Sequence, residues 1–146
     1  MEELTNILRL FKFRQPLEMR WSDMDQMGHI NNAVYLTYFE HARGYYYHES
    51  CEWNWKEDGI ILANASIDYL RPIVFPSTCF IYVRTTKIGN KSMDLEYIIL
   101  HEENNAKTMM ARGTTTLVMF DYKTQGSIVV PDRIREKIKN YEIALV

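Results

Sequence analysis

Residues 21–43 hold side chains that could carry out acyl-transfer chemistry. Within residues 23–32 there are two carboxylates, a glycine, a histidine and two asparagines, and a helical pattern follows directly. An ionised aspartate in such a loop can attack a carbonyl carbon or activate water as a general base. The first turn of a helix offers free backbone N–H groups and a positive dipole end, which stabilise a developing oxyanion. This pattern predicts a hydrolytic site with Asp25 as its central residue.

The other residues of this loop have supporting roles in the prediction. Gly28 permits an unusual φ and a close approach of backbone to ligand. His29 and the side chains of Asn31 and Asn32 could position a water molecule or orient the Asp25 carboxylate.

Plainer interpretations of the same residue types remain open. An aspartate before a helix is a common N-terminal cap. Asp23, Asp25 and His29 are metal-ligand types, although their spacing fits no recognised metal motif and a second histidine is missing. Cys51 and Cys79, the only cysteines, could pair or act as nucleophiles, but without a secretion signal we expect free buried thiols.

A long helix is expected after the loop. Apolar and aromatic residues recur there at helical spacing: Val34, Tyr35, Tyr38, Phe39, Ala42, Tyr45 and Tyr46. They predict an amphipathic helix over residues 32–49, which the asparagines at its start can cap. Glu40 and Arg43 lie three residues apart and are expected to form an ion pair on its surface.

Period-two patterns after residue 60 predict an antiparallel sheet. The expected strands cover residues 61–69, 79–88, 93–101 and 107–122. On the first of them, one face is expected to carry Ile61, Ala63, Ala65, Ile67 and Tyr69. Turns are predicted at residues 89–90 and 102–106, and a short charged helix over residues 131–141. Because successive strands pair antiparallel and the apolar helix must cover one face of the sheet, the class is α+β.

Composition fits one soluble domain over residues 1–146. The chain is 47% hydrophobic and 25% charged, which is enough apolar material for a core without staples. The net charge of -2 predicts no nucleic-acid partner. We expect no membrane span, since no apolar run approaches ~18 residues. The start, with Glu2 and Glu3, is not typical of a signal peptide, so a cytoplasmic location is expected.

The loop and helix together resemble the signature of the hotdog-fold acyl-CoA thioesterases. The matching pattern is Asp23-x-Asp25-x-x-Gly28-His29-Ile30-Asn31-Asn32-x-x-Tyr35, followed by Tyr38-Phe39-Glu40-x-Ala42-Arg43. It is most similar to the 4-hydroxybenzoyl-CoA thioesterase-like family, including the YbgC and FadM types, and the order of elements agrees over nearly the whole chain. The resemblance implies a long central helix wrapped by a curved sheet, and hydrolysis of an acyl-CoA thioester without a cofactor.

The resemblance also implies roles for individual residues. Asp25 matches the family's catalytic aspartate, and the backbone N–H of Asn32 matches its carbonyl-polarising donor. A homodimer is implied, with sheets joined edge to edge and active sites at the interface, or a homotetramer of such dimers. The segment also resembles plant acyl-ACP thioesterases, but their catalytic asparagine corresponds to Met27 here, so the role of His29 stays open.

Substrate contacts are expected from polar and aromatic groups around the loop and at strand ends. Near the loop the candidates are Gly28, Asn31 and Tyr35. Asn64 and Ser66 are candidate pocket groups on the first strand after the helix. The phosphates of CoA need cationic or backbone donors, for which the candidates are Arg71, Lys91, Ser92 and Arg112.

Two other functions remain open at this stage. A hotdog hydratase or dehydratase acting on enoyl thioesters would also use an Asp and a His near a helix start. A non-catalytic acyl-CoA or acyl-carrier binding module would bind without turnover. The acyl chain, and the choice between CoA and a carrier protein, depend on the shape of the pocket.

Overall fold

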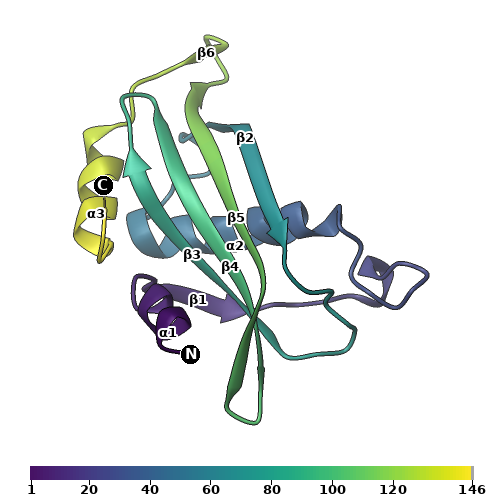
Figure 1. The fold of residues 1–146 in the computed structure, drawn as a ribbon. Coiled ribbons are helices and arrows are strands. Elements are labelled where there is room, and N and C mark those ends of the chain that lie inside the picture. The colour runs from purple at the N-terminus through teal and green to yellow at the C-terminus, as the bar shows by residue number, and fades with distance from the viewer. Residues whose placement is uncertain (146) are drawn as a thin grey trace.

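The computed structural model, which describes residues 1–145, has an antiparallel sheet wrapped around one long helix (Figure 1). The main strands are β1 (Phe13–Pro16), β2 (Ile60–Tyr69), β3 (Cys79–Ile88), β4 (Ser92–Glu103) and β5 (Ala106–Asp121), in the order β1-β3-β4-β5-β2. A short β6 (Gly126–Ser127) pairs with β5. Helix α2 (Val34–Cys51) crosses one face of the sheet, as predicted for the hotdog fold.

Three smaller elements complete the chain. Helix α1 (Glu2–Leu8), for which no element was expected, packs with residues 10–11 on the face of the sheet opposite α2. A single 3-10 turn, η1 (Trp21–Asp23), begins the acidic loop. The predicted C-terminal helix is confirmed as α3 (Asp132–Tyr141), with Pro131 at its N-cap. None of the helices in residues 1–145 is long and apolar enough to cross a membrane.

Helix α2 lies where predicted and buries an aromatic stripe. It begins at Val34 and ends at Cys51, and Glu52 follows in the left-handed conformation that commonly ends a helix. The expected stripe is buried except at Val34, which is partly buried, and at Tyr45, which is 54% exposed; Tyr47 is buried in addition. The Phe39 ring stacks on Tyr97 of β4, with centroids 4.4 Å apart. The helix is thereby fixed against the centre of the sheet.

The position of β2 corrects one expectation. Strand β2 pairs with β5 and not with β3, the strand that follows it in the chain. Tight turns connect β3 to β4 and β4 to β5, but residues 70–78 are too long a connection for a hairpin and carry the chain across the sheet. Strand β2 therefore lies at an edge.

A bulge in β2 corrects a second expectation, that its apolar residues share one face. The register shifts between Leu62 and Asn64, so that Ile61 lies opposite Val118 whereas Ala65 lies opposite Thr115. Since the side chains of β5 alternate between faces, Ile61 and Ala65 point to opposite faces of the sheet. Asn64, opposite Thr116, is on the face away from α2.

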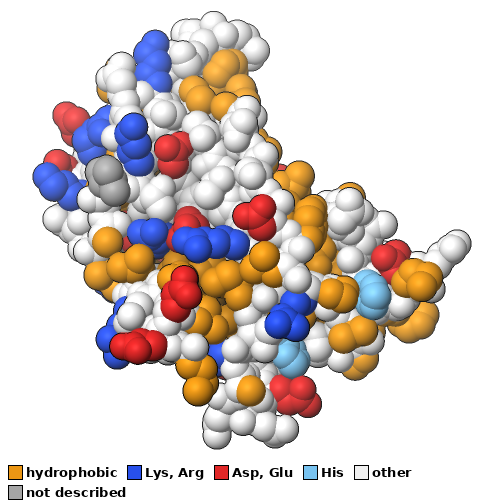
Figure 2. Space-filling model, in the orientation of Figure 1, with side chains coloured by type: hydrophobic (Ala, Val, Ile, Leu, Met, Phe, Trp, Pro, Cys, Tyr) orange, Lys and Arg blue, Asp and Glu red, His pale blue; other side chains and the backbone are white. Residues whose placement is uncertain are grey.

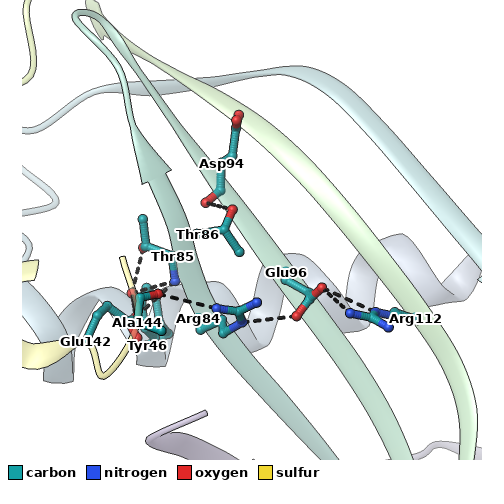
Figure 3. A network of polar contacts seen from close by, with 9 residues as sticks. All are labelled: Tyr46, Arg84, Thr85, Thr86, Asp94, Glu96, Arg112, Glu142 and Ala144. Atoms are coloured by element: carbon teal, nitrogen blue, oxygen red, sulfur yellow. Dashed lines mark hydrogen bonds and ion pairs between the residues drawn. The ribbon is translucent and has the colours of Figure 1, made fainter. Parts of the chain in front are cut away.

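Polar side chains cross-link the face of the sheet opposite α2 (Figure 3). The Glu96 carboxylate accepts hydrogen bonds from Arg84 at 3.0 Å and from Arg112 at 2.8 Å, which joins β3, β4 and β5. Beyond α3, the Glu142 carboxylate accepts the Thr85 backbone N–H at 2.9 Å and the Tyr46 hydroxyl. These contacts attach the C-terminal segment to β3 and α2.

The surface shown in Figure 2 mixes charged and hydrophobic side chains, and Lys and Arg lie close to Asp and Glu over much of it. Such a mixed surface agrees with the small net charge of -2.

Candidate active site

The Asp25 loop is a small hairpin that ends at the start of α2. Met24 and Ile30 form an antiparallel bridge at its base, and the Asp25 N–H donates to the His29 carbonyl at 2.7 Å. Gly28 has a φ of 79°, a conformation that glycine adopts at little cost. Backbone hydrogen bonds therefore fix the position of Asp25 relative to the helix.

The Asp25 carboxylate is oriented and accessible. Its Oδ1 accepts the backbone N–H of Met27 at 2.8 Å and that of His29 at 3.1 Å. Its Oδ2 has no hydrogen-bond partner within residues 1–145, and the side chain is exposed. An oriented carboxylate with one free oxygen suits a nucleophile or a general base. The contribution of His29 to this geometry comes from its backbone N–H.

The two asparagines at the helix start have different surroundings. The Asn31 side chain accepts the Ala33 N–H at 2.9 Å, and its carbonyl accepts the Val34 N–H at 2.9 Å. Asn31 therefore forms an Asx turn just before α2. The N-cap of the helix is Ala33 and no side chain caps it, so the expected asparagine cap is not formed. The Asn32 carbonyl accepts the Tyr69 hydroxyl at 2.9 Å, whereas its N–H has no partner among the described residues. The family resemblance predicts this free N–H as the donor that polarises the thioester carbonyl.

Asp23 anchors the loop from inside the protein. This side chain is 2% exposed and accepts the Tyr38 hydroxyl at 2.7 Å and the Arg20 backbone N–H at 3.0 Å. The Arg20 guanidinium adds an ion pair at 3.1 Å. Burial opposes the charge, but the hydrogen bonds from Tyr38 and Arg20 outweigh it and hold the pKa of the Asp23 carboxyl below its usual value. Asp23 thus ties the loop to α2.

We predict that Asp23→Asn lowers the free energy of unfolding by about 1–3 kcal/mol at neutral pH, because charge-assisted hydrogen bonds are lost. A carboxyl whose pKa is depressed in the folded state stabilises the protein above its unfolded pKa, about 3.9. That contribution disappears as the pH falls through the lower folded value. Urea unfolding of both proteins at pH 7 and at decreasing acid pH should therefore show a difference that narrows below about pH 4. A difference independent of pH would contradict the assignment.

The structure brings only some of the predicted substrate-binding residues to the loop. Tyr35 is buried there and its ring meets the Tyr69 ring edge-on, with centroids 4.9 Å apart. Arg71 follows β2 at the same end of the sheet, with its N–H bonded to the Met110 carbonyl at 3.1 Å. Asn64 and Ser66 lie on the face away from α2. Arg112 lies on that face as well and is bound to Glu96.

Lys91 and Ser92 lie at the other end of the sheet. Ser92 pairs with Val118 of β5, whereas Tyr69, which bonds to Asn32, pairs with Ala111 of the same strand. Seven residues of β5 separate those positions, about 24 Å along the strand at ~3.4 Å per residue. Within one chain, the β3–β4 turn therefore cannot contact a ligand group close to Asp25.

The structure bears on two alternatives from the sequence, a role for the cysteines as a disulfide or as nucleophiles and a metal site in the acidic loop. Both cysteines are free and buried, as expected. Burial raises the pKa of the Cys51 thiol to about 11 and also raises that of Cys79, which does not favour either as a nucleophile. Among the described residues, no three His, Cys, Asp or Glu side chains are grouped to hold a metal ion.

A groove beside α2 was not predicted. Its volume is about 1080 Å³, and it begins at Arg20 and Tyr38, the two residues that hold Asp23. Further along α2 its wall includes Arg43, the partner of Glu40 in the predicted ion pair, at 4.0 Å. Its opposite wall includes Ile60 and Leu62 of β2 and Leu117 of β5, which are distant in sequence from α2. No local sequence pattern could indicate such a groove.

Comparisons with known proteins agree with this fold. The model of the Thioesterase-like superfamily matches residues 19–138. The chain is 29% identical over 126 residues to the long-chain acyl-CoA thioesterase FadM of Escherichia coli (strain K12), covering 84% of this chain and 94% of that protein. A thioesterase complexed with coenzyme A and Zn from Thermus thermophilus is similar in structure, with 32% identity, a TM-score of 0.79 and coverage of 91% and 96% of the two chains.

A predicted thioesterase from Bacillus stearothermophilus has 25% identity and a TM-score of 0.79, over 90% of this chain and 97% of that one. The hotdog fold and the named relatives define the class as thioester hydrolases. The chain belongs to the thioesterase-like superfamily, which confirms the resemblance found in its sequence.

Proposed function

We propose that this protein hydrolyses an acyl-CoA thioester to a free acid and CoA, with Asp25 as the catalytic carboxylate. The observation that carries the proposal is the Asp25 carboxylate, held by two backbone N–H groups with one oxygen free, in the loop that leads to the unpaired N–H of Asn32. The names of two relatives support it, since one acts on long-chain acyl-CoA and the other is complexed with coenzyme A.

In this mechanism the thioester carbonyl oxygen accepts the Asn32 N–H at the positive end of α2. The oxyanion that forms there is stabilised by that donor, a contribution on the order of 3 kcal/mol. As nucleophile, Asp25 Oδ2 bonds to the carbonyl carbon, CoA leaves as a thiolate, and water hydrolyses the resulting anhydride. As general base, Asp25 takes a proton from water, the water oxygen attacks, and the thiolate leaves and is protonated.

The proposal is tested by incubating the purified full chain with short, long and aromatic acyl-CoAs and measuring free thiol. We expect thiol release together with the unmodified acid. A changed acyl chain without free thiol would identify a hydratase instead. Binding without any product would identify a binding module.

We propose further that two copies pair through β2, so that the sheets join edge to edge. The support is the exposure of β2, in which Ile61 is 39%, Leu62 44% and Tyr69 49% exposed in the single chain. A ten-residue strand with apolar side chains and an open hydrogen-bonding edge readily pairs with another strand. A two-fold axis across β2 is an isologous contact, the commonest kind in homodimers.

Such pairing would also allow Lys91 and Ser92 to contribute to CoA binding, although both lie far from the Asp25 loop of their own chain. Two antiparallel β2 strands lie head to tail, so the Ile60 end of one strand approaches the Tyr69 end of the other. The Lys91–Ser92 turn is at the Ile60 end of its own sheet, because Ser92 and Ile61 both pair with Val118. The turn of one subunit would then lie toward the Asp25 loop of its partner, where it could bind CoA phosphates.

We predict that Ala65→Lys gives a monomer. Ala65 is exposed at the middle of β2, so a lysine costs the single chain little, but in the dimer two charges would meet near the axis. Sedimentation of the variant and of the wild type at equal concentration measures the change. Ala106→Lys, an exposed alanine at the β4–β5 turn, is the matched control and should leave the assembly intact. A dimeric Ala65→Lys protein would contradict pairing through β2.

A further inference from the structure

The groove beside α2 is large and has mixed chemistry. Its volume is about 1080 Å³, and aromatic, aliphatic and charged side chains line it. The members from α2 include His41, Arg43, Gly44, Tyr45 and Tyr47, and those opposite include Trp55, Leu62, Leu117 and Tyr122. The groove begins beside the residues that hold the Asp25 loop and extends along the helix. An acyl chain leaving the thioester could therefore follow it.

Arg43 is a cation in this groove, and no buried carboxylate within residues 1–145 forms an ion pair with it. Its side chain is only 11% exposed, and one guanidinium nitrogen donates to the Tyr97 hydroxyl at 3.1 Å. The nearest carboxylate, that of Glu40, is 4.0 Å away and 80% exposed, so the pair is weak. Buried charges are ordinarily paired, and a guanidinium has five N–H donors to satisfy. Arg43 is thus equipped to bind an anion.

Tyr47 adds a second unpaired group to the same wall. Its hydroxyl is completely buried and has no hydrogen-bond partner among the described residues. Tyr97 and Arg43 are among the groups close enough to influence the charge of this hydroxyl. Burial, and then the neighbouring Tyr97, raise the pKa of Tyr47, although Arg43 opposes this shift. The phenol therefore keeps its proton and remains a potential donor.

We propose that the groove binds the acyl group and that Arg43, assisted by Tyr47, selects acyl chains that end in a carboxylate. This inference rests on the proposed function, because it specifies the substrate of the same site. Arg43 lies nine residues after the first residue of α2, about 14 Å along the helix at ~1.5 Å per residue. Chains of medium to long length should therefore show the strongest selection.

The experiment compares binding of pairs of acyl-CoAs of equal chain length, one ending in methyl and one in carboxylate. Equilibrium affinities are measured with Asp25→Asn, so that turnover does not interfere. We expect the carboxylate member to bind at least about tenfold more tightly in the medium or long pairs, as a charge-assisted pair allows. Equal or weaker binding of the carboxylate member in every pair would overturn the inference. The same result is expected if a second subunit covers Arg43, and it would overturn the inference in that case too.

Three further variants, each combined with Asp25→Asn, test whether Arg43 and Tyr47 cause the preference for chains that end in a carboxylate. Arg43→Gln can still donate to Tyr97 but lacks the charge, and it should bring the affinity ratio to about one. Tyr47→Phe removes a hydroxyl that has no described partner, so it should fold normally and lower the ratio by a smaller factor. Tyr82→Phe, a buried phenol on the opposite face of the sheet, is the control and should keep the ratio. An unchanged ratio in Arg43→Gln would overturn the assignment.

Hydrolysis is measured separately with the wild type. Thiol release without any carboxylate preference in binding would remove this inference and leave the thioesterase proposal intact. A carboxylate preference in binding without thiol release from any acyl-CoA would contradict the thioesterase proposal and leave the selection by Arg43 intact.

Discussion

Replacement of Asp25 by asparagine is expected to lower kcat by about a thousandfold, within the range of general-base contributions. Asparagine has nearly the same shape, and its carbonyl oxygen can still accept the N–H groups of Met27 and His29. The loop should therefore keep its conformation. The amide, however, can neither attack a thioester carbon nor take a proton from water. Initial rates of thiol release at saturating acyl-CoA measure the effect.

The control for this prediction is Glu57→Gln, the same carboxylate-to-amide change at an exposed position in the connector after α2. It should retain the wild-type rate, and thermal unfolding should show that both variants are folded. Near-full activity of Asp25→Asn would exclude Asp25 as the catalytic residue. If Asp25 is the nucleophile, hydroxylamine added during turnover should also attack the anhydride at the Asp25 carbonyl and leave a hydroxamate on the protein, which mass spectrometry detects. A general base leaves Asp25 unmodified, and the acyl hydroxamate itself is not diagnostic because hydroxylamine also cleaves acyl-CoA directly.

The local features of this protein were predictable from its sequence because their signals are local. The stripe that includes Tyr38, Phe39 and Ala42 has helical spacing, and the helix lies within two residues of the predicted boundaries. Gly28 has the positive φ expected of a glycine in a tight loop. The turns of the β3–β4 and β4–β5 hairpins also follow from short-range residue preferences.

The features that could not be predicted depend on contacts between distant residues. Nothing in the sequence around β2 indicates that it pairs with β5, some fifty residues later, or that a bulge turns Asn64 to the outer face. The Asn32 carbonyl accepts the hydroxyl of Tyr69, which lies 37 residues later in the chain. The burial of Arg43 likewise depends on Tyr97 of β4. Sequence patterns identified the residues of the loop, but tertiary packing determines which substrate groups can reach them.

Gly113 is expected to be the most sensitive packing position between α2 and the sheet. It lies on β5, and a Cβ added there would be 2.3 Å from Phe39 Cε2 and 3.0 Å from the Ser66 carbonyl oxygen. The Phe39 ring is fully buried and stacked on Tyr97 at 4.4 Å, so it cannot move aside without losing that contact. We predict that Gly113→Ala lowers the free energy of unfolding by about 1–3 kcal/mol, the usual cost of overpacking a core.

A double-mutant cycle separates this clash from an intrinsic effect of alanine. In a Phe39→Leu background the ring is gone, so the added methyl should cost much less and the two changes should be non-additive. Gly126→Ala is the control, because the nearest atom to its added Cβ is Thr124 Oγ1 at 4.0 Å. Additive costs would mean that α2 does not approach β5 this closely. Since Asn32, whose N–H is the proposed donor, lies two residues before the start of α2, a shift of the helix in Gly113→Ala should also lower kcat in the thiol-release assay.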